Sequence, residues 1–267
     1  MLPSLFVPHG APTFALQPGE AGISLAQTAA GLPRKPRAIV VASAHWNTAA
    51  PTVGAAVRPE TIHDFSGFPA PLYDLDYPTA GAPEVAHEIA RLLGAAGLAA
   101  TIDASRGLDH AVWIPLRLMF PHADVPVVPL SIQSRLGPEH HYRLGQALAP
   151  LLRQDVLVVG SGNLTHNLRD FQFGAGNGDG TPAYVREFAD WIWQRIEADE
   201  IGALLDYRVQ APNAQRAHPT EDHLLPLFVA LGAAGAGFRA NRLYSGVDSR
   251  ILAMDIFSFQ PRPGAPQ

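Results

Sequence analysis

The sequence predicts a single-domain α/β fold with a largely parallel central sheet flanked by helices. Short runs of apolar and β-branched residues are typical of buried strands, and Ala/Leu-rich segments with helical spacing alternate with them along the chain. Hydrophobic residues make up 47% of the 267 residues and charged residues only 16%, so the chain can build a sizeable core.

Four strands are expected in chain order. Each is a short, nearly continuous apolar run, as found in strands that are covered on both faces of a parallel sheet. They span residues 5–7, 38–43, 125–132 and 156–160.

Four helices are expected between and after these strands. They span residues 84–98, 139–153, 182–199 and 223–232. In the first, apolar residues recur at spacings of three and four, after Pro83 at the start and before Gly97 near the end. The glycine-rich stretch 171–181 predicts a loop. The proline-rich residues 261–267 predict a flexible tail, which leaves 1–260 as the domain.

Composition excludes several classes of function. The 19 basic and 24 acidic residues give a net charge of −5, which argues against nucleic acid binding. The absence of cysteine excludes disulfides, Cys-based zinc sites and a Cys nucleophile. The amino-terminal residues do not resemble a signal peptide, and no apolar run approaches the roughly 20 residues of a membrane span. We therefore expect a cytoplasmic protein without a membrane partner.

The motifs of several common enzyme classes are also missing. The chain has no Gly-rich nucleotide-binding loop that ends in Lys-Ser/Thr, and no His-Glu-x-x-His. The stretch GSGN at 160–163 lacks the Gly-x-Ser-x-Gly spacing of a serine nucleophile elbow. Serine nucleophile chemistry is therefore poorly supported.

Eleven histidines are the most informative residues. Four of them lie in helical or turn contexts with charged neighbours, and we expect these to be solvated surface residues. They are His87, His122, His140 and His141.

Four other histidines share a different context. His9, His45 and His166 each follow an apolar strand within a few residues, and His223 opens the last predicted helix. Because the carboxyl ends of parallel strands converge on one crevice, these side chains are expected to lie close together. Neutral imidazole is the commonest protein ligand for zinc, iron and copper, and a shared ion removes the cost of burying several imidazoles together. The sequence therefore predicts a metal site at the carboxyl ends of the strands.

Two nearby features have two readings each. His110 follows Asp109 and precedes an apolar, helix-like run, so it is either a helix-start residue capped by Asp109 or an acid/base group at the mouth of the site. The segment 61–69 mixes aromatic and polar residues with turn formers. It either lines a pocket for an aromatic ligand or is a loop held down by Phe65 and Phe68.

Six stretches in one order resemble a known family. They are LFVPHGAP at 5–12, ASAHW at 42–46, HDFSGFP at 63–69 with LY at 72–73, GLDH at 107–110 with Trp113, GSGN at 160–163 with HNL at 166–168, and HPT at 218–220 with HLLPL at 223–227. Together they resemble the class III extradiol ring-cleavage dioxygenases, in the branch of the 4,5-DOPA dioxygenases. The resemblance runs to about Gly232 and so covers most of the chain.

The resemblance implies one non-haem divalent metal on a single-domain α/β fold. Its ligands would be His9, His45 and His223. His166 matches a position that serves either as a further ligand or as the catalytic base, and His110 matches an acid or base near the bound substrate.

One departure leaves the third ligand open. The family usually has Thr-Pro-Glu-His, whereas this chain has Thr220, Glu221, Asp222 and His223 in succession. Glu221 or Asp222 could therefore supply a carboxylate ligand in place of His223.

The implied reaction is O2-dependent extradiol cleavage of a catechol ring, with a DOPA-like substrate favoured. A neutral histidine would take one catechol proton, with His166 as the first candidate and His110 as the second. Fe(II) is expected for this activity, while Zn(II), which lacks redox chemistry, also suits a histidine-rich site in the purified protein. The alternatives are a zinc-dependent hydrolase on the same scaffold and a metal-binding protein without turnover. The sequence does not predict the oligomeric state.

Overall fold

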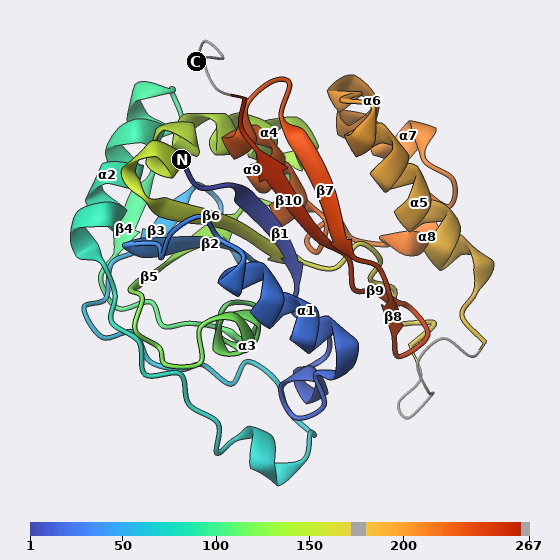
Figure 1. Cartoon of the computed structure of the whole chain (residues 1–267), viewed down its shortest axis with the longest axis horizontal. Helices are drawn as coiled ribbons and strands as arrows, with labels where there is room; N and C mark the ends of the chain where they lie inside the picture. The colour runs from blue at the N-terminus through green and yellow to red at the C-terminus, as the bar shows by residue number, and fades with distance from the viewer. Residues whose placement is uncertain (172–179, 263–267) are drawn as a thin grey trace.

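A mostly parallel sheet of eight strands forms the centre of the protein (Figure 1). The computed structural model describes residues 1–171 and 180–262. The strand order is β4-β3-β5-β2-β6-β1-β10-β7, and its four central strands run parallel to their neighbours within this group. These central strands are the four that the sequence predicts. In spatial order they are β5 (Val127–Ile132), β2 (Ala38–Asn47), β6 (Val156–Gly162) and β1 (Ser4–Pro8).

Shorter strands extend this parallel core on both sides. At one side β3 pairs antiparallel with β5, and β4 lies parallel to β3; at the other, β10 and β7 add antiparallel strands to β1. A two-stranded sheet, β8 with β9, lies apart from them. The bounds are β3 (Thr52–Gly54), β4 (Thr101–Asp103), β7 (Arg239–Tyr244), β8 (Val247–Asp248), β9 (Leu252–Ala253) and β10 (Ile256–Gln260). These six strands were not predicted.

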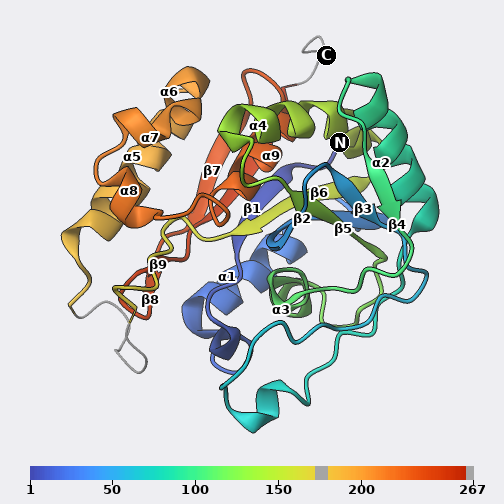
Figure 2. The same ribbon diagram turned by 180° about the vertical axis from the view of Figure 1, so that it is seen from behind.

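Helices cover both faces of the sheet (Figures 1 and 2). One face carries α2 (Pro83–Ala95), α4 (Gly137–Leu148) and α9 (Leu225–Ala234). The other carries α1 (Gly19–Ala30) and α3 (His110–Met119). Beside β7 lie α5 (Ala183–Glu197) and the short α6 (Ile201–Leu205), α7 (Tyr207–Gln210) and α8 (Ala214–Ala217). The described residues also form the 3-10 turns η1 (Pro12–Ala15), η2 (Ala70–Leu72) and η3 (Ala149–Gln154).

The sequence located all four predicted helices to within a few residues. The helix expected over 139–153 is α4 followed by the 3-10 turn η3, and the one expected over 223–232 begins two residues later, at Leu225. The domain limits 1–260 stay a prediction. Most of the expected loop 171–181, and residues 263–267 of the expected tail, fall outside the described residues.

The central strands are buried on both faces, as their apolar sequences predict. Along β2, Ile39 and Val41 pack into one hydrophobic core, while Val40 and Ala42 pack into the other. Successive side chains of a strand point to opposite faces, so one apolar run supplies both cores. None of the helices in the described part of the chain combines the length and hydrophobicity that a membrane crossing requires.

Glycine lets the amino-terminal end of α9 come close to the sheet. A Cβ on Gly162 would lie 2.1 Å from the carbonyl oxygen of His223, and a Cβ on Gly160 would lie 2.0 Å from that of Pro226. The Asn163 N–H donates to the same His223 carbonyl at 3.0 Å. The absence of a side chain at Gly160 and at Gly162 therefore allows His223 to stand this close to β6.

The surface prediction holds for two of the four histidines assigned to it. His87 and His122 are exposed and His140 is half-buried. For His141 the prediction was wrong, because this side chain is fully buried. Its ring lies between Gly137 and Gln133: Nδ1 donates to the Gly137 carbonyl at 2.7 Å, and the Gln133 N–H donates to Nε2 at 3.1 Å. Burial lowers the pKa of His141 to about 4, so it stays neutral inside the protein.

Candidate metal centre

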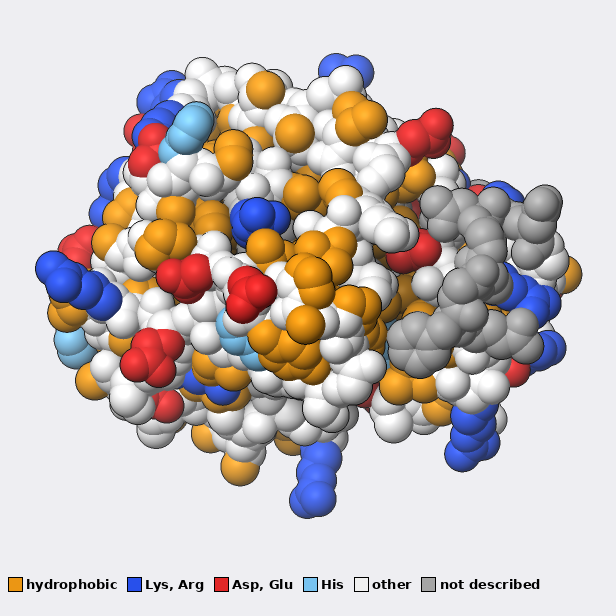
Figure 3. Space-filling view, turned by 90° about the horizontal axis from the view of Figure 1, so that it is seen from below, with side chains coloured by type: hydrophobic (Ala, Val, Ile, Leu, Met, Phe, Trp, Pro, Cys, Tyr) orange, Lys and Arg blue, Asp and Glu red, His pale blue; other side chains and the backbone are white. Residues whose placement is uncertain are grey.

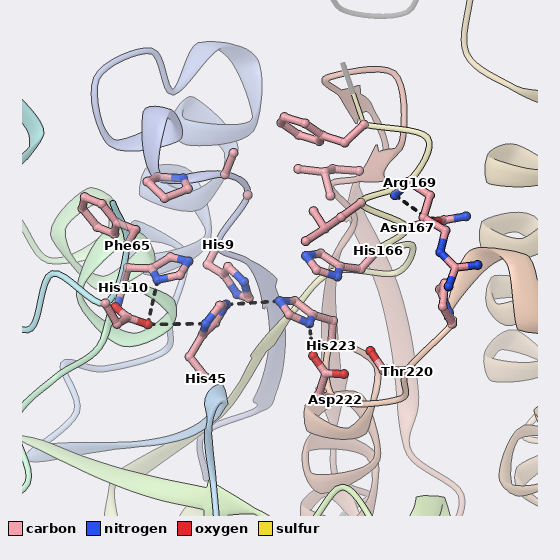
Figure 4. Close-up of a pocket in the computed structure, with 18 of the residues that line it drawn as sticks. His9, His45, Phe65, His110, His166, Asn167, Arg169, Thr220, Asp222 and His223 are labelled. Atoms are coloured by element: carbon pink, nitrogen blue, oxygen red, sulfur yellow. Dashed lines mark hydrogen bonds and ion pairs between the residues drawn. The ribbon is translucent and has the colours of Figure 1, made fainter. Parts of the chain in front are cut away.

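Five histidines from distant parts of the chain meet at one pocket (Figure 4). His9 follows β1 directly, His45 lies near the end of β2, and His166 comes four residues after β6. His110 is the first residue of α3, and His223 stands just before α9. In the register of the sheet Pro8 pairs with Gly162, and Ser43 with Ser161. The strand ends are therefore level, which brings the strand-end histidines His9, His45 and His166 together as predicted.

The distances between ring nitrogens suit a single ion. Ligand atoms of His9, His45 and His110 all lie within 4.8 Å of one another. Nε2 of His45 lies 3.1 Å from Nε2 of His223. Two nitrogens bound to one zinc-like ion at about 2.0–2.1 Å would stand about 2.9–3.4 Å apart. The pair His45 and His223 has this spacing, and the group His9, His45 and His110 could also hold one metal ion.

Hydrogen bonds orient His9 for this role. The Ser161 hydroxyl donates to the carbonyl of Ala111, so its oxygen is left to accept from Nδ1–H of His9, 3.3 Å away. This assignment places the lone pair on Nε2 of His9, where Nδ2–H of Asn163 donates to it at a long 3.5 Å and a metal could bind in its place.

Asp222 and Asp64 orient the rings of His223 and His45 in the same way. Nδ1 of His223 donates to Asp222 at 2.5 Å, and Nδ1 of His45 lies 3.4 Å from Oδ2 of Asp64. Both contacts favour a proton on Nδ1 and a lone pair on Nε2. Since His45 and His223 face each other through Nε2, a cation between them would satisfy both lone pairs (Figure 4).

Three histidines of the cluster, His9, His45 and His166, are held uncharged. Burial lowers the pKa of His9 well below its usual value, and the neighbouring imidazoles, led by His45, lower it further. Burial likewise lowers the pKa of His45 to about 2 and that of His166 to about 2. A metal can bind only the neutral ring, so His9 and His45 need no deprotonation at neutral pH before they coordinate an ion.

The two carboxylates remain ionised beside the rings. Burial alone would raise the pKa of Asp64, but the contact with His110 outweighs it and lowers this pKa to about 2. For Asp222 the bond to His223 likewise outweighs burial and lowers the pKa. Two negative charges beside the imidazoles would offset the charge of a bound divalent cation.

His166 has a geometry unlike that of the other four. Its ring lies flat on that of His223, with 3.4 Å between ring centroids and 4° between the planes. An imidazole lone pair lies in the plane of its ring, and two parallel stacked planes do not meet. One ion therefore cannot be bound in-plane by both His166 and His223 in this arrangement, which favours His166 as a proton-transferring group.

Asp64, and not Asp109, holds the start of α3. Oδ1 of Asp64 accepts the backbone N–H of His110 at 2.9 Å, and its Oδ2 lies 3.0 Å from Nδ1 of His110, out of line for a hydrogen bond. Asp109 makes no side-chain cap and is bonded to Ser43 and Arg106. Of the two readings of His110, capping by Asp109 is therefore ruled out, and His110 lines the pocket.

The structure bears on the carboxylate alternatives for the third ligand. Glu221 accepts a hydrogen bond from the Tyr207 hydroxyl at 2.8 Å and does not line the pocket. Asp222 lines the pocket but is engaged by Nδ1 of His223. Both contacts support His223 over either carboxylate.

The segment 61–69 serves both expected roles. Phe65 and Phe68 line the pocket and also pack against the hydrophobic core. The Phe65 ring lies 5.7 Å from that of His110, centroid to centroid. Figure 3 views the molecule from the side on which the parallel strands end and shows hydrophobic side chains gathered beside exposed histidine atoms. The wall next to the histidines is therefore suited to an aromatic ring.

Sequence reasoning missed three contributors to this site. Asp64 and Ser161 act through histidines and carry no motif of their own, although each lies within a stretch that was quoted for the resemblance. Arg169 lines the pocket three residues after His166. Its position on the loop that follows a strand end is the one signal that could have identified it.

Comparison with known proteins gives consistent matches. The family described as the catalytic LigB subunit of aromatic ring-opening dioxygenase matches residues 8–251. A 4,5-DOPA dioxygenase extradiol of Beta vulgaris is 38% identical over 264 residues, covering 96% of both chains. One of the same name from Escherichia coli (strain K12) is 38% identical over 240 residues, covering 87% of this chain and 85% of that protein.

The fold comparison agrees with the sequence matches. The crystal structure of an uncharacterized protein from Escherichia coli K12 superposes with a TM-score of 0.81 at 29% identity. It covers 97% of this chain and 99% of that one, so the whole architecture is shared.

Proposed function

The chain belongs to the family of catalytic LigB subunits of aromatic ring-opening dioxygenases, and from this premise we propose its substrate and the roles of its residues. It is an extradiol dioxygenase, which cleaves a catechol ring with O2 beside the diol. We propose that a DOPA-like catechol is the substrate and that His9, His45 and His223 hold one Fe(II). The observation that carries the ligand set is the convergence of three imidazoles whose other nitrogen each faces an acceptor.

The metal would supply what the side chains cannot. When bound, a divalent iron with open coordination positions lowers the pKa of a catechol hydroxyl and brings the ring and O2 together. The protein's own contribution is to keep His9 and His45 neutral and to orient all three proposed ligands, so that their Nε2 lone pairs are preorganised.

His166 is the proposed general base. Its neutral ring lies flat on His223, beside the proposed ligands, and it lines the same pocket. In this role it takes a hydroxyl proton of the catechol on a ring nitrogen and later returns that proton to the product. Burial, and next the neighbouring His223, lower the pKa of His166 to about 2, so its ring is neutral and able to accept a proton. The negative charge of a bound catecholate would raise the pKa of His166 and let it hold the proton.

His110 is the second acid/base candidate and faces the same space. Oδ1 of Asp64 accepts the backbone N–H of His110, and Oδ2 of Asp64 lies beside Nδ1 of the His110 ring. The Phe65 ring beside it excludes water from that side of the pocket. We propose that His110 orients or protonates the substrate while His166 acts as base.

The two alternative functions fit less well. Neither a zinc-dependent hydrolase nor a protein without turnover is favoured, because the relatives that match most of this chain are named dioxygenases. Zinc bound to purified protein would be an inactive occupant of the same ligands, since zinc has no redox chemistry. A cytoplasmic location stays a prediction from the sequence.

The decisive experiment is oxygen uptake by the Fe(II)-reconstituted protein with a small panel of catechols. We expect one O2 consumed for each ring opened, and a yellow ring-opened product that absorbs where catechols do not. The metal-free protein and the Zn(II)-loaded protein are the controls and should consume none. Catechol loss without O2 consumption, or no catechol loss with iron bound, would contradict the proposal.

A further inference from the structure

The pocket is larger than the diol ring requires. Its volume is about 710 Å³, in the range of cavities that enclose a whole drug-sized ligand. The histidines and Phe65 occupy one end, and Asn167 and Arg169 lie at the other (Figure 4). If the diol binds at the histidines, the rest of the substrate extends toward Arg169.

Charge is distributed unevenly along this pocket. Its two carboxylates, Asp64 and Asp222, both lie against histidines. Among the described residues that line the pocket, Arg169 is the one Lys or Arg side chain. The end away from the metal site therefore carries a positive charge with no carboxylate in the lining beside it.

Arg169 also differs from the arginines around it. Arg216 pairs with Asp170 and lies over the Tyr184 ring, and Arg208 donates to the carbonyl of His218. Within residues 1–171 and 180–262, the guanidinium of Arg169 makes no hydrogen bond or ion pair. Its backbone is nevertheless fixed, because its N–H donates to Oδ1 of Asn167 at 3.1 Å. The side chain is thus held at the pocket by its backbone and keeps its donors for a ligand.

We propose that Arg169 binds an acidic group on the side chain of the catechol and selects anionic substrates. This inference rests on the proposed function for the place of the diol. A planar guanidinium pairs with a carboxylate through two parallel hydrogen bonds, which suits an aryl-alkyl acid or an amino acid. Arg169 is a specificity residue and takes no part in opening the ring.

The test compares two ligands that differ only in charge, 3-(3,4-dihydroxyphenyl)propionate and its amide. The readout is the acid-to-amide ratio of kcat/KM for the Fe(II) enzyme. Because Arg169 is exposed, its contribution is moderate, and we expect Arg169→Gln to lower this ratio about 10-fold through KM. Arg169→Lys should lose less than Arg169→Gln, and Arg169→Glu should lose more.

The control is Arg153→Gln, which removes an exposed arginine on η3, outside the pocket. It should leave the ratio unchanged. A ratio that is the same in the parent and in Arg169→Gln, or one that falls equally in the control, overturns the proposal.

A second readout separates this inference from the proposed function. Anaerobic calorimetry measures the Kd of the acid and of the amide for the metal-loaded protein, and requires no turnover. If the parent opens no catechol but binds the acid more tightly, and Arg169→Gln abolishes that difference, the selectivity stands while the dioxygenase assignment fails. If the parent opens catechols without preferring the acid, the inference fails and the function stands.

Discussion

Asp64 is a single carboxylate that contacts two histidines with different proposed roles. It lies 3.4 Å from Nδ1 of His45, a proposed ligand, and 3.0 Å from Nδ1 of His110, a proposed acid or base. The same carboxylate anchors the backbone at the start of α3. It can therefore set the orientation of both rings without touching metal or substrate, as outer hydrogen-bond partners of metal ligands do.

Replacing Asp64 by Asn tests this positioning role. The variant keeps an oxygen for the His110 N–H but loses the charge beside both rings, so kcat or metal affinity should fall about 10- to 100-fold. Steady-state kinetics and a metal-competition titration measure the two losses, and the pH profile of kcat should change shape. Asp74→Asn, which changes an exposed carboxylate elsewhere between β3 and α2, is the control. Wild-type kinetics and wild-type metal affinity in Asp64→Asn would show that Asp64 does not position His45 and His110.

The proposed ligands His9 and His45 and the proposed acid/base group His110 should respond differently to substitution. His9→Ala and His45→Ala should each lose the metal, because either change leaves two of the three proposed ligands. His110→Ala should keep the metal and lower kcat by about 100-fold, as expected on losing an acid/base group. Elemental analysis of the purified variants, together with oxygen uptake, checks both statements. Full metal occupancy in His9→Ala, or loss of metal in His110→Ala, would reverse the assignment.

At the scale of elements, the contact between β6 and α9 controls where His223 stands. Gly162→Ala would push a Cβ to within 2.1 Å of the His223 carbonyl, and backbone cannot yield as a flexible side chain can. We expect a loss of about 1–3 kcal/mol in the free energy of unfolding, as for overpacked cores, together with weakened metal binding. Urea denaturation of the metal-free variant measures the first effect, and a metal titration measures the second.

A glycine elsewhere in the chain provides the matched control. Gly94 lies in α2 with nothing within 4 Å of an added Cβ. Gly94→Ala should raise the free energy of unfolding by about 0.5–1 kcal/mol, since alanine is the better helix former. Equal effects at Gly94 and Gly162 would mean that the contact between α9 and β6 leaves room for a Cβ at Gly162.

The strands that the sequence predicted are those whose burial can be recognised from their own residues. The apolar runs of β1, β2, β5 and β6 are covered on both faces, so their composition alone identifies them. The strands β3 and β4 have three residues each, and β7 is partly exposed with polar residues along it, so neither length nor pattern marks them. The helix α1 contains two glycines and buries few residues, which conceals its periodicity.

Part of the site was predictable because the ends of the buried strands could be located from the sequence. His9, His45 and His166 follow strand ends, and the topology of a parallel sheet brings such positions together. Asp64 reaches the site from a long loop, and His141 is buried by the way α4 packs, so both depend on tertiary contacts that no local pattern records. The ring stacking of His166 on His223 is likewise a property of the assembled fold.

At the scale of the whole molecule, the neutral histidines make stability depend on pH. His9, His45 and His166 have lowered pKa values in the folded protein, so only the unfolded chain takes up protons as pH falls below about 6.5. Stability is therefore complete above pH 6.5 and decreases below it, by up to about 1.4 kcal/mol per pH unit for each histidine. The lowered pKa values of Asp64 and Asp222 add a loss only below about pH 4, where unfolded carboxylates protonate.

This pH dependence can be measured on metal-free protein by urea denaturation at pH 7.5 and pH 5.5. We expect lower stability at pH 5.5 and a smaller difference in His166→Gln, which removes one titrating group. A bound metal should raise the melting temperature at both pH values, because it binds only the folded chain. Equal stability of the metal-free protein at the two pH values would contradict the neutral state of the cluster.

The proposed ligands are separated by most of the chain, from His9 on β1 to His223 before α9. A ribosome-bound chain that has not yet exposed the α9 segment lacks the third imidazole and the surface against which it is placed. The finished site exists only after β1, β2 and β6 have paired and α9 has docked on them. Iron uptake should therefore be post-translational, and the appearance of bound metal would report that folding is complete.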